Sequence, residues 1–191
     1  METSDHELML AVRAGDIDQL GELFERYHRQ LFAYLVRLTN DFSASEDLVQ
    51  TTFQRVLQYR HTYREDGKFS TWLYHLARTC AADSFRKNRI IHSADTDGSL
   101  DTFAASTVSP ANTVTLSDDL DMLNTALGSL PHEDREIIHL ARIENRAHED
   151  TARVLGCSVG AVKVRLHRAL KLLRETYQKL CNETTLESFQ S

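Results

Sequence analysis

The stretch VLGCSVGAVKVRLHRALKLL, residues 154–173, indicates a long helix that follows a tight turn. Gly156, Cys157 and Ser158 make the turn, and Ser158 belongs to the residue types that cap a helix N-terminus. A shorter amphipathic segment, residues 148–155, precedes the turn. Because a short helix, a turn with glycine and a second helix form a helix-turn-helix, this stretch predicts that motif.

The second helix of this motif has an apolar face and a polar face. At about 100° per residue the apolar positions fall together: Val159, Val162, Leu166, Ala169, Leu170 and Leu173. Ala161, Arg165 and Arg168 point the other way, while Lys163 falls near the buried edge. A small residue such as Ala161 lets the backbone approach the major groove, and the arginines can reach bases or phosphates.

Local charge helps to separate a nucleic-acid surface from an ordinary solvated face. The whole chain carries a formal net charge of −6. Between residues 149 and 179, however, three acidic residues are outnumbered by Arg153, Lys163, Arg165, Arg168, Lys171, Arg174 and Lys179. Generic amphipathic helices also carry Lys and Arg, so periodicity alone leaves both interpretations open. The local positive charge favours DNA.

The acidic residues collect in the middle of the chain. No Lys or Arg occurs from His92 to Met122, and the aspartates there equal the whole net charge: Asp95, Asp97, Asp101, Asp118, Asp119 and Asp121. The segment is rich in Ser, Thr and Ala and has no sustained apolar period. It therefore predicts a flexible acidic linker over residues 91–119.

The flanking segments, residues 1–90 and 120–182, are predicted to form two small domains, with a tail at 183–191. Only seven Gly and two Pro occur, and strand-like alternation is nowhere sustained, so the fold class is all-α. A flexible linker of about 28 residues has a relaxed span of ~30 Å and a stretched span above ~90 Å. One turn of DNA is about 34–36 Å, so domains joined in this way can contact elements more than a turn apart.

Helix boundaries in the first domain can be predicted from capping residues. Ser4, with Glu7 three residues later, predicts a capping box, and Gly15 is expected to end that helix. Asp16 is expected to cap the next helix. A further amphipathic helix is predicted over residues 44–59.

Cysteine and histidine usage argues against disulfides and metal sites. Cys80, Cys157 and Cys181 are odd in number and far apart, so reduced thiols are expected. His132 and His139 come nearest to a ligand pair, but no further ligand stands at metal-site spacing. The sequence also has no glycine-rich phosphate loop and no nucleophile elbow. We therefore expect no metal, no cofactor and no enzymatic activity.

The N-terminal residues lack the basic start and apolar run of a signal peptide. No apolar segment approaches the ~20 residues that a membrane span requires. A cytoplasmic protein without direct membrane insertion is expected.

Three segments, in order, resemble the extracytoplasmic-function (ECF) sigma factors of the sigma-70 family. SEDLVQTTFQRVLQY (45–59) is similar to the family's core-polymerase-binding helix, and FSTWLYHLARTCAADSFRK (69–87) to its −10-element helix. LGCSVGAVKVRLHRALKLLRE (155–175) is similar to its final helix-turn-helix. The resemblance implies an alternative sigma factor that binds the β and β′ subunits of core RNA polymerase. It would direct transcription initiation at specific promoters and be held inactive by an anti-sigma factor.

The resemblance also implies three sets of site residues. The −35 element of promoter DNA would be bound by Ser158, Ala161, Lys163, Arg165 and Arg168, with Lys163 better suited to a phosphate than to a base. The separated strand of the −10 element would be bound by Tyr63, Arg64, Arg78, Thr79, Ala82, Arg86 and Lys87, including residues of the loop from His61 to Lys68. Core polymerase would be bound by Asp47, Gln50 and Gln54.

Some positions depart from the family pattern. The family commonly has Asn where Thr79 stands, which leaves the base preference at the −10 element open. It has a cap-forming Ser or Thr where Ala147 stands, at the start of the short helix over 148–155. A conventional helix-turn-helix repressor or activator is the alternative function, and it would need a dimerisation surface and a ligand pocket.

Overall fold

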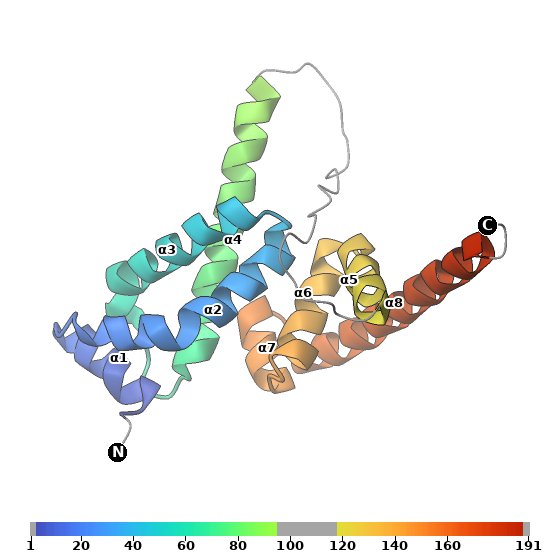
Figure 1. The fold of residues 1–191 in the computed structure, drawn as a ribbon. Helices are drawn as coiled ribbons and strands as arrows, with labels where there is room; N and C mark the ends of the chain where they lie inside the picture. Colours follow the sequence, from blue (N-terminus) through green and yellow to red (C-terminus); the bar gives the residue numbers. More distant parts are fainter. Residues whose placement is uncertain (1–2, 95–117, 189–191) are drawn as a thin grey trace. The chain divides into compact units, whose positions relative to one another are not determined.

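The computed structural model describes residues 3–94 and 118–188. All regular elements within these two ranges are helices, as the sequence predicts, and they divide into two compact units (Figure 1). The centre of the predicted linker, residues 95–117, lies outside the described residues. The flanking helices extend to Ala94 and from Asp118, so the ends of the predicted linker are helical.

Four helices and one 3₁₀ turn build the first unit. They are α1 (Asp5–Ala14), α2 (Gln19–Thr39), α3 (Phe42–Tyr59), the 3₁₀ turn at Arg60–Thr62 and α4 (Phe69–Ala94). The long amphipathic helix α2 packs against α1, α3 and α4. In Figure 1 these helices run from blue to green.

The core of the first unit forms around the apolar face of α2. Leu23, Leu31 and Leu35 are fully buried there, and they are joined by Val56 of α3 and Leu73 of α4. Burial of one such side chain contributes about 1.5–3 kcal/mol, so this face fixes the arrangement of the unit.

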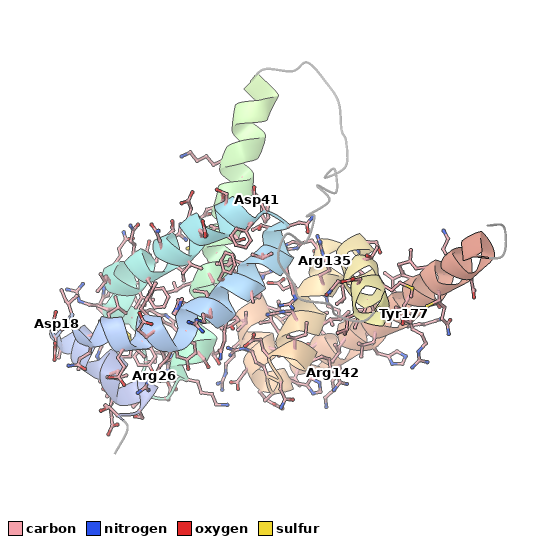
Figure 2. All side chains as sticks on the ribbon, viewed as in Figure 1. Asp18, Arg26, Asp41, Arg135, Arg142 and Tyr177 are labelled. Atoms are coloured by element: carbon pink, nitrogen blue, oxygen red, sulfur yellow. The ribbon has the colours of Figure 1, made fainter. Side chains whose placement is uncertain are left out.

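Capping groups define where the helices of the first unit begin and end. The predicted capping box is present, because the Ser4 side chain accepts a hydrogen bond from the Glu7 amide and the Glu7 carboxylate accepts one from the Ser4 amide. Gly15 ends α1 with φ of 114°, which suits glycine. Asp41 (Figure 2) caps α3 by accepting a bond from the Ala44 amide.

The predicted cap of α2 is wrong. The residue at the N-cap position is Asp18, and its side chain makes no capping bond. The Asp16 carboxylate instead accepts a hydrogen bond of 3.1 Å from the side chain of Gln19. Asp16 stands two residues before the N-cap position, and its carboxylate bonds to a side chain instead of to a helix amide.

The second unit contains the helix-turn-helix. Its elements are α5 (Asp118–Ser129), α6 (His132–Ile138), a π-helical turn (His139–Ile143), α7 (His148–Leu155) and α8 (Val159–Ser188). Helix α8 packs against α5 and α6, drawn from yellow to red in Figure 1. Its core combines apolar residues of α6, the π-helical turn and α8: Ile137, Leu140, Val162 and Ala169.

Candidate nucleic-acid and polymerase interfaces

The turn between α7 and α8 is built as the sequence predicts. Gly156 has φ of 66°, a conformation that glycine adopts without steric cost. The Cys157 amide donates to the carbonyl of Ala152 at 3.0 Å. The Ser158 hydroxyl accepts from the Ala161 amide at 3.2 Å and so caps α8. These bonds fix the first turn of α8 beside α7.

The solvent-facing side of α8 carries the residues expected to bind the −35 element. Val162 and Leu166 are buried, while Arg168 is exposed and Arg165 is partly exposed. Lys163 is also exposed, so its predicted place near the buried edge is wrong. The buried stripe of α8 is narrower than the helical wheel indicated.

Arg165 forms an ion pair within the second unit. Its Nη2 atom lies 2.5 Å from Oε2 of Glu133, at the start of α6. The Arg165 side chain is 36% exposed and that of Glu133 is 73% exposed. The pair is therefore open to solvent and can be exchanged for a nucleic-acid contact.

Helix α4 has a buried face and an exposed polar face. Leu73, Ala77 and Cys80 are buried. The residues expected at the −10 element fall on the other side: Thr79, Ala82, Arg86 and Lys87 are exposed, and Arg78 is partly exposed. The Thr79 hydroxyl donates to the carbonyl of His75 at 2.9 Å, which fixes its rotamer on the helix surface.

Asp83 connects α4 to α3. Its carboxylate lies 2.7 Å from Nη2 of Arg55 and 3.6 Å from Nη1 of Arg86. The hydrogen bond to Asp83 is the main reason why the pKa of Arg55 is raised. This link places one end of the exposed α4 face, at Arg86, in a defined position relative to α3.

The loop before α4 differs from the prediction at one position. Tyr63 is expected to bind the −10 strand, and an aromatic ring binds an unstacked base by stacking on it. However, Tyr63 is only 2% exposed and packs against Phe69 and Trp72. Burial also raises the pKa of its phenol. Its ring therefore presents no free stacking face in this structure. Arg64 is exposed, and its Nε atom lies 3.1 Å from Oδ1 of Asp66.

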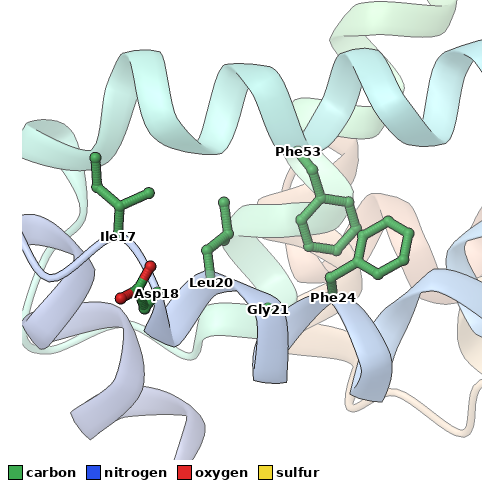
Figure 3. A pocket seen from close by; sticks show the side chains of 6 residues that line it. All are labelled: Ile17, Asp18, Leu20, Gly21, Phe24 and Phe53. Atoms are coloured by element: carbon green, nitrogen blue, oxygen red, sulfur yellow. The ribbon is translucent and has the colours of Figure 1, made fainter.

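Helix α3 presents a polar face beside an apolar pocket. Asp47, Gln50 and Gln54 are exposed, as predicted from their position off the apolar stripe. Close by in sequence, Phe53 lines an open pocket of about 400 Å³. The α2 side of this pocket and the preceding turn contribute Ile17, Asp18, Leu20, Gly21 and Phe24 (Figure 3). Ile17 is 51% exposed, so an apolar contact is available next to the polar face.

In the described ranges, no three His, Cys, Asp or Glu side chains are arranged to hold a metal ion. The helices described are also too short or too polar to cross a membrane. The three cysteines are free thiols.

Comparisons with known proteins identify the family. The sigma-70 region 2 model matches residues 23–90, and the sigma-70 region 4 model matches residues 120–173. The chain is 32% identical to the ECF RNA polymerase sigma factor SigX of Bacillus subtilis over 84% of each chain. It is 30% identical to the RNA polymerase sigma factor CarQ of Myxococcus xanthus, over 88% of this chain and 94% of that protein.

Solved structures agree with this assignment. The sigma factor RpoE of Bartonella quintana, in complex with the anti-sigma factor NepR, is 26% identical with a TM-score of 0.68, over 83% of this chain and 96% of that one. CnrH, in complex with the cytosolic domain of CnrY, shares the fold with a TM-score of 0.65 at 23% identity. The match covers 94% of this chain and 97% of CnrH. The chain belongs to the ECF RNA polymerase sigma factors. It is an alternative sigma factor, and thus a transcription initiation factor.

The structure adds three residues that sequence patterns did not indicate. Glu133 pairs with Arg165 across 32 positions of sequence. His6 and Arg13 of α1 contact Tyr63 in the loop before α4, across 57 and 50 positions. No periodicity or motif relates such distant residues, so only the folded chain reveals them.

Proposed function

We propose that this chain binds the β and β′ subunits of core RNA polymerase and directs the polymerase to promoters through two separate DNA contacts. The observation that carries this proposal is that each unit presents an exposed, basic helix face opposite its buried face. These faces lie on α4 in the region 2 match and on α8 in the region 4 match. An enzymatic activity forms no part of the proposal, and the protein acts in the cytoplasm.

Helix α8 reads the −35 element. In the proposed complex, Ser158 and Ala161 of its capped N-terminus lie at the major groove; the exposure of Arg168 and the partial exposure of Arg165 further along the helix support this orientation. A guanidinium group can form two hydrogen bonds with the edge of a guanine, whereas a lysine such as Lys163 supplies a point charge for a phosphate. Arg165, once released from Glu133, is thus the specificity determinant of this unit, and Arg168 contributes mainly a phosphate contact.

Helix α4 and the capture loop, defined as residues 61–68, receive the separated strand of the −10 element. The exposed face formed by Arg78, Thr79, Ala82, Arg86 and Lys87 supplies positive charge along the strand backbone. In the capture loop, exposed Arg64 and Asp66 can bond to the edge of an unstacked base. Tyr63 stabilises the loop and does not contact the strand, because its ring is buried against Phe69 and Trp72.

The polar face of α3 binds core polymerase. Asp47, Gln50 and Gln54 are exposed without any role in the apolar core, which supports an intermolecular role. The neighbouring pocket at Ile17 and Phe53 supplies apolar area of the kind that interfaces bury. An anti-sigma factor controls access to these surfaces, a proposal supported by the likeness to RpoE crystallised with its anti-sigma factor.

Reconstituted transcription tests the proposal. Core polymerase, with and without the chain, is incubated with a library of genomic fragments from the source organism, and transcript 5′ ends are mapped. We expect chain-dependent start sites that share two sequence elements at a constant separation. The absence of any chain-dependent start site would contradict the proposal. Start sites define the matched −10 and −35 elements that the following experiments use.

A further inference from the structure

The capture loop is held in place by the N-terminal helix α1. Nδ1 of His6 lies 3.0 Å from the hydroxyl oxygen of Tyr63. Arg13 donates from Nη1 to the backbone carbonyl of Tyr63 at 3.1 Å and from Nη2 to Oε1 of Glu65 at 2.6 Å. We call His6 and Arg13 together the α1 clasp. The clasp bonds to both the backbone and the side chains of the loop.

Tyr63 links the clasp to the base of α4. Its hydroxyl donates to the carbonyl of Gly67 at 2.9 Å, which closes the loop on itself. Because the phenol has one proton, the bond with His6 takes its proton from the imidazole. The ring centroids of Tyr63 and Trp72 are 5.4 Å apart, and Trp72 belongs to the first turns of α4. The loop is thus fastened on both sides of its exposed residues, Arg64 and Asp66.

Helix α1 is itself anchored to α2. The carboxylate of Asp5 accepts a hydrogen bond of 2.6 Å from Arg26 (Figure 2) and another from Tyr27. Leu8 and Met9 of α1 are buried. The region 2 family model begins at residue 23, so α1 lies before the matched segment. The element that fixes the loop is therefore outside the part of the chain by which the family is recognised.

We propose that His6 and Arg13 are positioning residues that set how selectively the capture loop accepts the −10 strand. This inference rests on the proposed function of the loop. The exposed residues Arg64 and Asp66 discriminate between bases only if the backbone that carries them is fixed before the strand arrives. The clasp supplies that fixed backbone at Tyr63.

The clasp is separable from the core of the unit. His6 and Arg13 are only partly buried, and the side chain of Arg13 is 33% exposed, whereas Leu8, Met9 and Val12 carry the apolar face of α1. Replacing His6 or Arg13 therefore leaves the buried apolar contacts of α1 in place. A loss of base selectivity can accordingly be measured in a folded protein.

The experiment measures holoenzyme binding to two fluorescently labelled single strands. One strand carries the matched −10 element and the other carries a single altered base. The variants are Arg13→Ala, His6→Ala and Arg13→Lys, with Arg29→Ala as an exposed control on α2 and Glu65→Gln as a variant that retains the bond to the Tyr63 carbonyl. Thermal unfolding and core affinity are measured for each variant.

We expect Arg13→Ala to weaken binding of the matched strand about tenfold, or ~1.4 kcal/mol, and of the altered strand much less, so that selectivity falls. His6→Ala also lowers selectivity relative to the wild type, whereas Arg13→Lys retains part of the wild-type selectivity. Glu65→Gln and Arg29→Ala retain all of it. Unchanged selectivity in both alanine variants of the clasp, or equal weakening of both strands, would overturn the inference. Equal binding of both strands by the wild-type holoenzyme would instead overturn the proposed function of the loop, and the inference with it.

Discussion

Glu133 holds the guanidinium group of Arg165 at 2.5 Å, so the arginine expected to read a base is occupied within its own unit. Contact with DNA requires this ion pair to open or to be shared. The carboxylate of Glu133 also stands where it repels an approaching phosphate. The pair therefore opposes DNA binding by an amount typical of exposed ion pairs, about 0.2–1 kcal/mol.

Replacing Glu133 with Gln should strengthen binding to the −35 element. The expected gain is about two- to fivefold at low salt, and it should diminish as salt screens the charge. The test is the affinity of the wild-type and variant holoenzymes for a duplex with the matched −35 element, measured across a salt series. Asp121→Asn changes the formal charge equally at an exposed position of α5 and serves as the control. Equal gains in both variants would show that net charge, and not the pair, is responsible.

Arg165 and Arg168 should have different roles on DNA. We expect Arg165→Ala to reduce discrimination between matched and altered −35 elements by ~1–3 kcal/mol, because a bidentate contact to guanine is lost. Arg168→Ala should weaken all sequences alike and lower the salt slope by about 1, as loss of a phosphate contact does. Full promoter activity in both variants would identify this side of α8 as a merely solvated face.

The polar face of α3 should matter for polymerase binding and not for stability. Since Asp47, Gln50 and Gln54 are exposed, replacing all three with Ala should change the melting temperature by no more than about 2 °C. Affinity for core polymerase should fall by about tenfold or more. Gln30→Ala, an exposed amide on α2, provides the control. Undiminished affinity for core polymerase in the triple variant would show that this face of α3 is not the polymerase-binding surface.

Helix positions and their faces could be predicted from the sequence because they depend on neighbours within one or two turns. The capping box at Ser4, the cap at Ser158 and the left-handed Gly15 are all local effects, and the structure confirms them. The buried stripe at Val162 and Leu166 follows from helical periodicity in the same way.

Long-range partners could not be predicted in this way. Tyr63 stands among polar residues in a loop, which is typical of an exposed position. It is buried because α1 and the first turns of α4 pack against it. Arg165 has the position of a free DNA-reading side chain, yet it is paired with Glu133 on another helix. Both outcomes depend on contacts between segments far apart in sequence, about which local patterns carry no information.

Cys80 should be the least reactive of the three thiols. It is 2% exposed and burial raises its pKa, whereas Cys157 and Cys181 are partly exposed. At pH 8 we expect a thiol reagent to label Cys80 only as fast as the first unit unfolds. Labelling of Cys80 at the rate of Cys157 in the native protein would contradict its burial.

The same burial makes the first unit sensitive to alkali. Burial raises the pKa values of Cys80 and Tyr63 in the folded state. Their contribution to stability is complete below the unfolded-state pKa values of about 8.5 for the thiol and about 10 for the phenol. It is lost as the pH rises through the higher pKa values of the folded state. The free energy of unfolding should therefore decline above about pH 8.5. Cys80→Ala, compared with Cys157→Ala across pH, separates this effect from general charge repulsion.

We expect the chain to select promoters as a subunit of polymerase and not alone. A net charge of −6 opposes association of the free chain with phosphates, while the basic faces are confined to α4 and α8. The most direct measurement is the affinity for a mapped promoter duplex and for a scrambled duplex at physiological salt, with the free chain, with core polymerase and with both together. We predict weak, unselective binding by the free chain and selective binding only by the combination. Tight, sequence-specific binding by the free chain would contradict the claim and favour a conventional helix-turn-helix repressor or activator.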